Sequence, residues 1–121
     1  MTYREHAPHP ALAPYVDRYW ASHGPAGVPR VILPDGCIDI LVDLAAPDTP
    51  IVIGTMTTAA RLSSGDARIV AVRFRPGGAA PFLRTAAGEL TDRSVPGVPW
   101  LHVDPQAPLA SLEASLLARL A

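Results

Sequence analysis

The sequence predicts a mainly β domain of the α+β class, and three observations support this prediction. Fourteen prolines and nine glycines divide the 121 residues into short segments, which favours strands and turns over long helices. Residues 37–44 alternate in the manner of a half-buried strand. Helical spacing of leucines is clear only near the end of the chain. We therefore expect one domain over residues 1–121, built mainly on strands.

The first element can be interpreted in two ways. Leu12, Val16, Tyr19 and Trp20 would fit one face of a helix, but prolines at positions 8, 10 and 14 oppose a long helix. We expect a turn of helix near Leu12, followed by a strand from about Tyr15.

The central region predicts three further β segments. Residues 30–44 are rich in β-branched side chains and are interrupted by Pro34-Asp35-Gly36, a sequence typical of a turn. After this turn the residues alternate between two faces: Ile38, Ile40, Val42 and Leu44 on one, and Cys37, Asp39, Leu41 and Asp43 on the other. The next segment covers residues 51–58, where Gly54 indicates a bulge or a close backbone approach. In the strand expected over residues 67–75, Val70, Val72 and Phe74 face opposite to Arg73 and Arg75.

Helices are expected only in the last part of the chain. Pro76-Gly77-Gly78 ends the preceding strand and opens a short helix over residues 79–84, with Pro81 tolerated in its first turn. Residues 85–105 are predicted to be mostly irregular. The terminal segment forms an amphipathic helix, because its leucines recur at helical spacing: Leu109, Leu112, Leu116 and Leu120, with Leu117 widening the stripe.

Composition and charge exclude several classes of protein. No apolar run is long enough to span a bilayer, and the first residues lack the apolar core of a signal peptide. The lone Cys37 excludes an internal disulfide and fits a reducing compartment. The net charge is −1 and the charges are interspersed, so the chain has no basic cluster of the kind that binds nucleic acid. A cytoplasmic protein that contacts neither membrane nor nucleic acid is expected.

The order of motifs resembles the N-terminal domain of AraC-type transcription regulators. The resemblance covers roughly residues 3 to 98, and its most specific parts are Leu33-Pro34-Asp35-Gly36 followed by Phe74-Arg75-Pro76-Gly77-Gly78. It implies a cupin-like antiparallel β-barrel or sandwich, roughly residues 14–76, with a helical part at roughly 78–121. Such domains sense a small-molecule effector and dimerise. Those regulators continue with two helix-turn-helix units, so this chain is expected to be an excised domain or a free-standing relative that does not bind a promoter directly.

Candidate ligand contacts come mainly from large side chains. If a ligand binds, we expect Trp20, Met56, Phe74 and Phe82 to supply contact area, although most large side chains in so small a domain serve as core. Arg73 and Arg75 are expected either to pair with Asp39 and Asp43 across neighbouring strands or, with the amides after them, to form an anion site. The first interpretation is favoured.

Metal and thiol chemistry have weaker support in the sequence. Cys37 could be a sensing thiol or a soft metal ligand, but its acidic neighbours in sequence favour a packed, inert cysteine. The four histidines match no metal-binding spacing and include no His-x-His, so neither a metal nor another cofactor is expected.

Two interpretations remain open for the contact made by the leucine stripe, and more than one for the function of the chain. The stripe can cover the open side of the barrel or meet a second copy, and the resemblance favours a homodimer through Leu109, Leu112, Leu116 and Leu120. The leading hypothesis is a non-enzymatic sensor of a small, partly apolar molecule. The alternative is a free-standing protein that sequesters a compound such as a drug, or that pairs with a full-length regulator. A cupin-type metalloenzyme has the least support.

Overall fold

The computed structural model describes residues 2–24, 29–32, 37–53, 60–63, 67–84, 94–96 and 98–121. Within them the elements are, in chain order, β1 (Thr2–His6), the 3-10 helix η1 (Pro10–Leu12), β2 (Val16–Gly24), β3 (Pro29–Ile32), β4 (Asp39–Asp43), β5 (Ile51–Ile53), β6 (Ala60–Ser63), β7 (Ala67–Phe74), α1 (Ala80–Leu83), β8 (Ser94–Pro96) and α2 (Pro108–Leu120). The prediction of a mainly β fold with a short helix and a terminal helix is confirmed.

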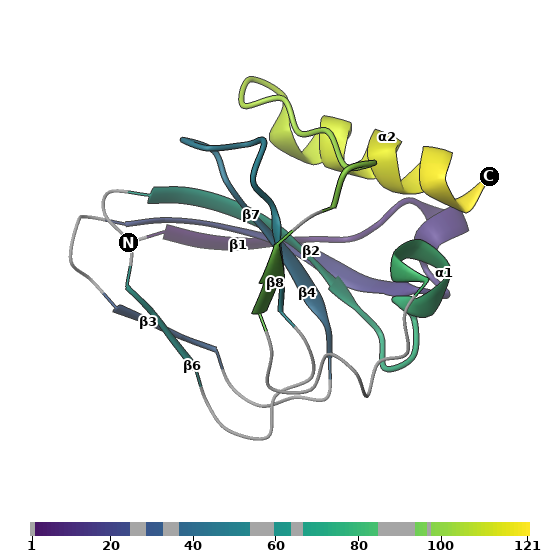
Figure 1. Ribbon diagram of the computed structural model, residues 1–121, viewed down its shortest axis with the longest axis horizontal. Coiled ribbons are helices and arrows are strands. Elements are labelled where there is room, and N and C mark those ends of the chain that lie inside the picture. Colours follow the sequence, from purple (N-terminus) through teal and green to yellow (C-terminus); the bar gives the residue numbers. More distant parts are fainter. Residues whose placement is uncertain are drawn as a thin grey trace.

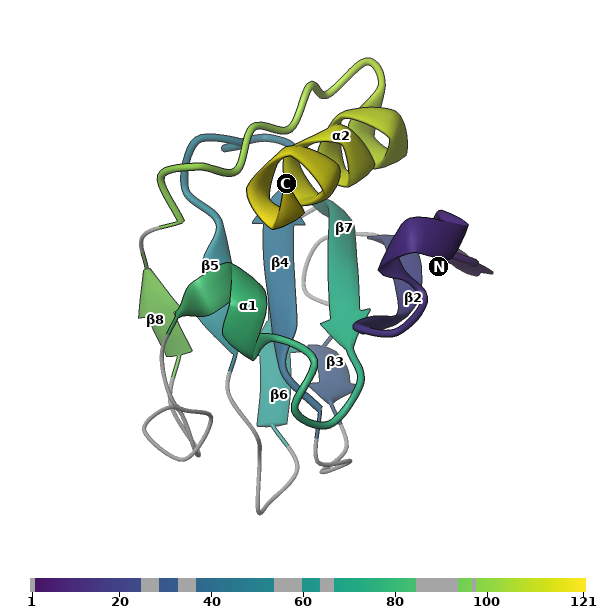
Figure 2. The same ribbon diagram turned by 90° about the vertical axis from the view of Figure 1, so that its right-hand side faces the viewer.

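A six-stranded antiparallel sheet forms the centre of the molecule. Its strand order is β1-β2-β7-β4-β5-β8, and β3 and β6 form a separate antiparallel pair. In the described residues the sheet is open, with β1 and β8 at its two edges. Helix α2 lies on one side of this sheet, and the β3–β6 pair lies on the other side (Figures 1 and 2). The molecule is therefore layered, and only one face of the main sheet is covered by α2.

Several predicted elements are confirmed, and three strands were missed: β1, β8 and β6, which lies between the segments expected at 51–58 and 67–75. The helical turn near Leu12 and the strand that follows it match η1 and β2. The strand β1 was not predicted because its residues, Tyr3 to His6, lack a regular apolar alternation. The strand β8 falls in a stretch predicted to be irregular, where Pro96 is tolerated because β8 is an edge strand. The turn at residues 33–36 and the end of the segment at 54–58 lie outside the described residues.

The larger core lies between the six-stranded sheet and α2. Ile40 and Val42 of β4, together with Val72 and Phe74 of β7, are fully buried in it. The predicted alternation of the β4 side chains between two faces is confirmed, because the even-numbered residues belong to this core while Leu41 belongs to a second cluster. The apolar face predicted for the strand over residues 67–75 is confirmed in the same way.

The leucine stripe of α2 covers the sheet of its own chain. Leu112 and Leu116 are completely buried, and Leu109, Leu117 and Leu120 are partly buried against the same core. Of the two roles left open by the sequence, the structure therefore shows the covering role. Leu112 and Leu116 are not available to a second copy because they are buried in their own chain, and a homodimer through the rest of α2 remains a prediction. Among the described residues, no helix is both long enough and apolar enough to cross a membrane.

The backbone explains why glycine occupies both positions after Pro76. Gly77 has a φ of +77°, a backbone conformation that side chains with a Cβ rarely adopt. At Gly78 a Cβ would overlap the backbone carbonyl of Tyr15. The carbonyl of Tyr15 also accepts a hydrogen bond from the N–H of Arg75 at 2.8 Å, and Gly78 N–H donates to the Arg75 carbonyl at 2.7 Å. The motif thus lets the end of β7 lie directly against the start of β2.

Glu113 of α2 holds the helix to the N-terminal part of the chain. Its Oε2 accepts a hydrogen bond from the Tyr19 hydroxyl and another from the backbone N–H of His9, each at 2.8 Å. Burial, together with the hydrogen bond to this carboxylate, raises the pKa of Tyr19. A neutral Tyr19 is therefore part of the link between β2 and α2.

Tyr19→Phe should make the protein less sensitive to alkaline pH. Because the pKa of Tyr19 is higher in the folded than in the unfolded chain, its contribution to stability is fully present below the unfolded value of about 10 and is lost as the pH rises above it. The melting temperature of the unmodified protein should therefore fall more steeply above about pH 10 than that of the variant. At neutral pH the variant should lose about 1 kcal/mol with the hydrogen bond. Tyr15→Phe serves as the control, and parallel curves for the unmodified protein and Tyr19→Phe would contradict this account.

Candidate functional site

The face of the six-stranded sheet opposite α2 carries a second, smaller apolar cluster. This cluster contains Trp20, Leu41, Ile53, Ile69 and Ala71, and we call the surface that it forms the Trp20 face. Strand register places its members in rows, since Trp20 lies opposite Ala71, and Ala71 lies opposite Leu41. The Trp20 face is thus an apolar layer across the four neighbouring strands β2, β7, β4 and β5.

Asp39 is the polar centre of the Trp20 face. Its Oδ2 accepts a hydrogen bond from the Trp20 indole Nε1–H at 3.0 Å. Arg73 donates from Nε to Oδ1 at 3.2 Å and from Nη2 to Oδ2 at 3.3 Å. Asp39 is only 4% exposed, and it lies directly opposite Arg73 because β4 and β7 are antiparallel neighbours. The expected cross-strand ion pair is confirmed for Asp39 and Arg73, and the indole is held in place by the same carboxylate.

A second polar group lies at the β1 edge of the same face. Glu5 Oε2 accepts hydrogen bonds from the Tyr3 hydroxyl at 2.9 Å and from Arg18 Nη1 at 2.6 Å, and Arg18 Nε donates to Asp17 at 2.6 Å. The hydrogen bonds from Arg18 and Tyr3 lower the pKa of Glu5, and those from Arg18 to Glu5 and Asp17 raise the pKa of the guanidinium. Arg18 lies opposite Arg73 in the β2–β7 register, yet each of the two cations is paired with a carboxylate. The charges of the Trp20 face are therefore largely neutralised within the chain.

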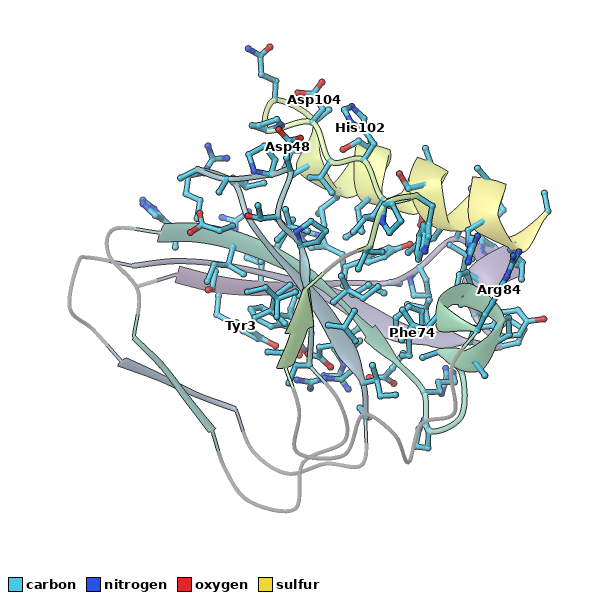
Figure 3. All side chains as sticks on the ribbon, in the orientation of Figure 1. Tyr3, Asp48, Phe74, Arg84, His102 and Asp104 are labelled. Carbon is cyan, nitrogen blue, oxygen red and sulfur yellow. The ribbon has the colours of Figure 1, made fainter. Side chains whose placement is uncertain are left out.

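Two large apolar side chains remain exposed on this face. Tyr3 is 52% exposed, and its ring lies 6.0 Å from that of Trp20. Figure 3 shows Tyr3 on the side of the sheet away from α2. Ile51, which is 44% exposed, lies opposite Leu41 and so on the same face. The five residues that define the Trp20 face are themselves buried, between 0% and 7% exposed, so only Tyr3 and Ile51 reach solvent on this face.

The hydroxyl oxygen of Ser22 is the one buried side-chain polar atom in the described part of the chain that has no hydrogen-bond partner. The residue is 6% exposed, and its Oγ is enclosed. By strand alternation its side chain shares the face of Trp20, between Tyr3 of β1 and Ile69 of β7. A buried hydroxyl without a partner is costly, so it marks a position where a polar group from outside the chain would be stabilised.

The structure does not bring the four predicted aromatic and methionine contacts together. Trp20 lies on the Trp20 face, whereas Phe74 and Phe82 lie on the other side of the sheet. These two phenylalanines are fully buried, with ring centroids 5.2 Å apart, and serve as core. Met56 lies outside the described residues. The sheet therefore separates Trp20 from the two phenylalanines that were expected to share its pocket.

Arg73 and Arg75 do not form a joint anion site. Arg73 is held on Asp39, whereas Arg75 donates from Nε to the Ala13 carbonyl at 2.8 Å and lies 3.9 Å from an oxygen of Asp17. Asp43 is not paired with either arginine, since its Oδ1 accepts from the N–H of Ala45 in the following turn. The expected ion pair between Asp39 and Arg73 is therefore present. Arg75 and Asp43 do not pair with each other, because Arg75 lies near Asp17 and Asp43 accepts a hydrogen bond in its own turn.

Cys37 lies two residues before Asp39 and is half-buried. In the part of the chain that the structure describes, no group of three or more histidine, cysteine, aspartate or glutamate side chains could hold a metal ion. Sequence reasoning missed Ser22, Tyr3 and Glu5 because their placement depends on the unpredicted strand β1. The only signal was the alternation of Tyr3 and Glu5, which is too short to stand out.

The fold and the Trp20 face define a mainly antiparallel β domain with one face covered by α2 and a second buried apolar cluster on the opposite face. A family model described as a domain of unknown function (DUF6597) matches residues 4–96, and the chain belongs to this family. The matched region runs from β1 to β8 and so includes the whole Trp20 face, while α2 follows it. No curated protein and no solved structure matches the chain.

Proposed function

We propose that this chain is a non-enzymatic regulatory domain that binds a small molecule on the Trp20 face, related to the sensor domains of AraC-type regulators. The observation that carries the proposal is the buried Ser22 hydroxyl, which has no partner in the described part of the chain and lies on the same face as Trp20, in the position opposite the exposed Tyr3. Because the Ser22 Oγ is enclosed, a ligand would reach it by displacing side chains that now cover it, and it would then bury apolar area and satisfy the hydroxyl at the same time.

A cupin-like arrangement is part of the proposal. The β3–β6 pair lies on the side of the main sheet away from α2, which is the side of the Trp20 face (Figure 1). A second layer on this side would convert the open sheet into one wall of a barrel, with the Trp20 face lining the interior. Small barrels bind their ligands in such interiors.

The chemistry of the face favours a neutral, partly apolar ligand with at least one hydrogen-bonding group. Glu5 is paired with Arg18, and Asp39 is paired with Arg73, so neither ion pair offers an uncompensated charge. The apolar layer and the exposed Tyr3 ring favour a flat or hydrophobic body. The hydroxyl of Ser22 can donate or accept one hydrogen bond.

Occupancy of the face could reach α2 through β2. Trp20 points to the Trp20 face, and its neighbour Tyr19 points to the opposite side, where its hydroxyl donates to Glu113 of α2. A ligand that shifts β2 would therefore change how α2 packs on the sheet. In the proposed homodimer, α2 would transmit this change in position to the second copy of the chain.

Thermal-shift screening with neutral, hydrophobic metabolites tests the proposal, followed by calorimetric titration of each compound that raises the melting temperature. Ser22→Ala should weaken binding about tenfold, because one hydrogen bond is lost. The same change should leave the free energy of unfolding equal or higher, because it removes an unsatisfied buried hydroxyl.

Thr49→Ala is the control for Ser22→Ala. It removes an exposed loop hydroxyl, whose bond is to the Ala46 carbonyl, and should not change affinity. If no compound in a broad neutral library binds, or if Ser22→Ala binds the hits as tightly as the unmodified protein, the Trp20 face is not the ligand site.

A further inference from the structure

The side chain of Tyr3 borders the buried hydroxyl of Ser22 at the β1 edge of the Trp20 face. The two residues lie directly opposite each other in the β1–β2 register, so their side chains share this face and are neighbours. The other large side chains of the main sheet next to Ser22 on this face, Trp20 and Ile69, are only 5% and 6% exposed, whereas Tyr3 is 52% exposed. Of these three side chains, Tyr3 is therefore the one that separates the hydroxyl from solvent.

Two contacts hold the Tyr3 ring in this position. Its centroid lies 6.0 Å from that of the Trp20 ring, with an angle of 32° between the ring planes. Its hydroxyl donates a hydrogen bond to Oε2 of Glu5 at 2.9 Å, and Arg18 fixes this carboxylate by donating to the same oxygen at 2.6 Å. Since Glu5 lies opposite Trp20 in the β1–β2 register, the ring is held between a flat apolar surface and a hydrogen-bond acceptor.

Tyr3 can leave this position without disturbing the sheet. In the described part of the chain β1 is an edge strand, and residues 3–7 are all exposed. A change of rotamer would carry the ring past the edge into solvent, and it would break one exposed hydrogen bond and one ring contact. Such changes are fast for exposed side chains and leave the backbone pairing intact. Trp20 cannot move in this way, because its indole N–H donates to the buried Asp39 at 3.0 Å.

We propose that the Tyr3 ring occupies the place of a ligand ring, and that the ligand is a small neutral aromatic molecule with a hydrogen-bond donor, such as a phenol, which displaces Tyr3. This inference rests on the proposed function and names the chemical class of ligand for the same face. The ligand ring would take over the contact with Trp20, and its donor would take over the bond to Glu5. A donor is required because an ionised carboxylate only accepts hydrogen bonds. Once Tyr3 has moved aside, the same molecule can also reach the Ser22 hydroxyl.

p-Cresol, which is the tyrosine side chain as a free molecule, tests the proposal in the variant Tyr3→Ala. In calorimetric titrations of the full chain, the variant should bind p-cresol at least about tenfold more tightly than the unmodified protein, because the side chain that competes for the site is gone. Toluene lacks the hydroxyl and should bind the variant about tenfold more weakly than p-cresol, because it cannot donate to Glu5. Equal affinity of both proteins for p-cresol, or of the variant for both compounds, would overturn the proposal.

Two further variants show where p-cresol binds. Tyr3→Phe keeps the ring and loses the hydroxyl, so its affinity for p-cresol should lie between those of the unmodified protein and Tyr3→Ala. Ile51→Ala removes the other exposed large apolar side chain of the face, on β5 and away from Ser22, and should bind p-cresol no better than the unmodified protein. All three variants should fold, because both replaced side chains are about half exposed. An equal gain in affinity for Ile51→Ala and Tyr3→Ala would mean that p-cresol binds apolar surface in general, which would refute the role of Tyr3.

The compounds found by screening separate a failure of this inference from a failure of the proposed function. Every compound whose binding depends on Ser22 should bind Tyr3→Ala more tightly than the unmodified protein, because it no longer competes with the tyrosine ring. Compounds that depend on Ser22 but bind both proteins equally would keep the Trp20 face as the ligand site and refute the role of Tyr3. If no compound binds the unmodified protein, the proposed function fails, and the p-cresol titrations still decide whether Tyr3 fills an aromatic site.

Discussion

Replacing Gly78 with alanine is expected to lower the free energy of unfolding by about 3 kcal/mol. The added Cβ would overlap the backbone carbonyl of Tyr15, which is not the flexible end of a side chain and cannot rotate away. That carbonyl also accepts the hydrogen bond from Arg75 N–H, so moving it would weaken the contact between β2 and the end of β7. The loss should be measured by urea unfolding at neutral pH.

Gly77→Ala is the matched control for this prediction. Gly77 has nothing within 4 Å of the position of a Cβ, but its φ of +77° makes alanine unfavourable. We expect a loss of about 1 kcal/mol from backbone conformation alone. Similar losses at the two glycines would mean that the approach of Tyr15 does not set the structure of this turn.

Asp39→Ala should lower the free energy of unfolding by about 3 kcal/mol as well, for a different reason. The substitution removes the acceptor of the Trp20 indole N–H and both hydrogen bonds that Arg73 makes to the carboxylate. Since Asp39 is only 4% exposed, water cannot fully replace these interactions. Urea unfolding gives the free energy, and near-ultraviolet circular dichroism reports whether the indole keeps its fixed environment.

Asp39→Asn serves to separate the charge from the shape. Its side-chain oxygen can still accept the hydrogen bond from Trp20, but it cannot form an ion pair with Arg73. We expect a smaller loss, with the near-ultraviolet signal of the indole retained. If Asp39→Ala is as stable as the unmodified protein, Asp39 is not the centre that organises the Trp20 face.

The strands near the centre of the sheet were the parts that the sequence predicted best. Strand β4 has apolar residues at every second position, and both of its neighbours are strands, so local pattern and burial agree. The edge strands β1 and β8 were missed because edge strands carry polar or proline residues and take their structure from their partners. The open six-stranded sheet was not predicted, since strand order depends on contacts between distant segments.

The candidate site was predicted only in part, for a related reason. Asp39 and Arg73 were recognised as an ion pair because each lies on the polar side of a clear strand. Trp20 was grouped with Phe74 and Phe82 on residue type alone, although the two faces of the sheet keep them apart. Nothing local in the sequence marks Ser22, whose importance follows from its burial and its lack of a described partner. Which residues share a face across strands is decided by register, and register became visible only in the structure.

The most direct test of the central claim follows the two tryptophan indole N–H signals of the protein by nuclear magnetic resonance, while a neutral hydrophobic compound found by screening is added. The chain has two tryptophans, and they report on different places: Trp20 on its own face, and Trp100 on the other side of the sheet, where Arg119 of α2 lies over its ring. We predict that the indole signal of Trp20 shifts in proportion to occupancy while that of Trp100 stays in place. A saturable shift confined to Trp100, or no shift of Trp20 with any compound that binds, would contradict the assignment of the Trp20 face as the ligand site.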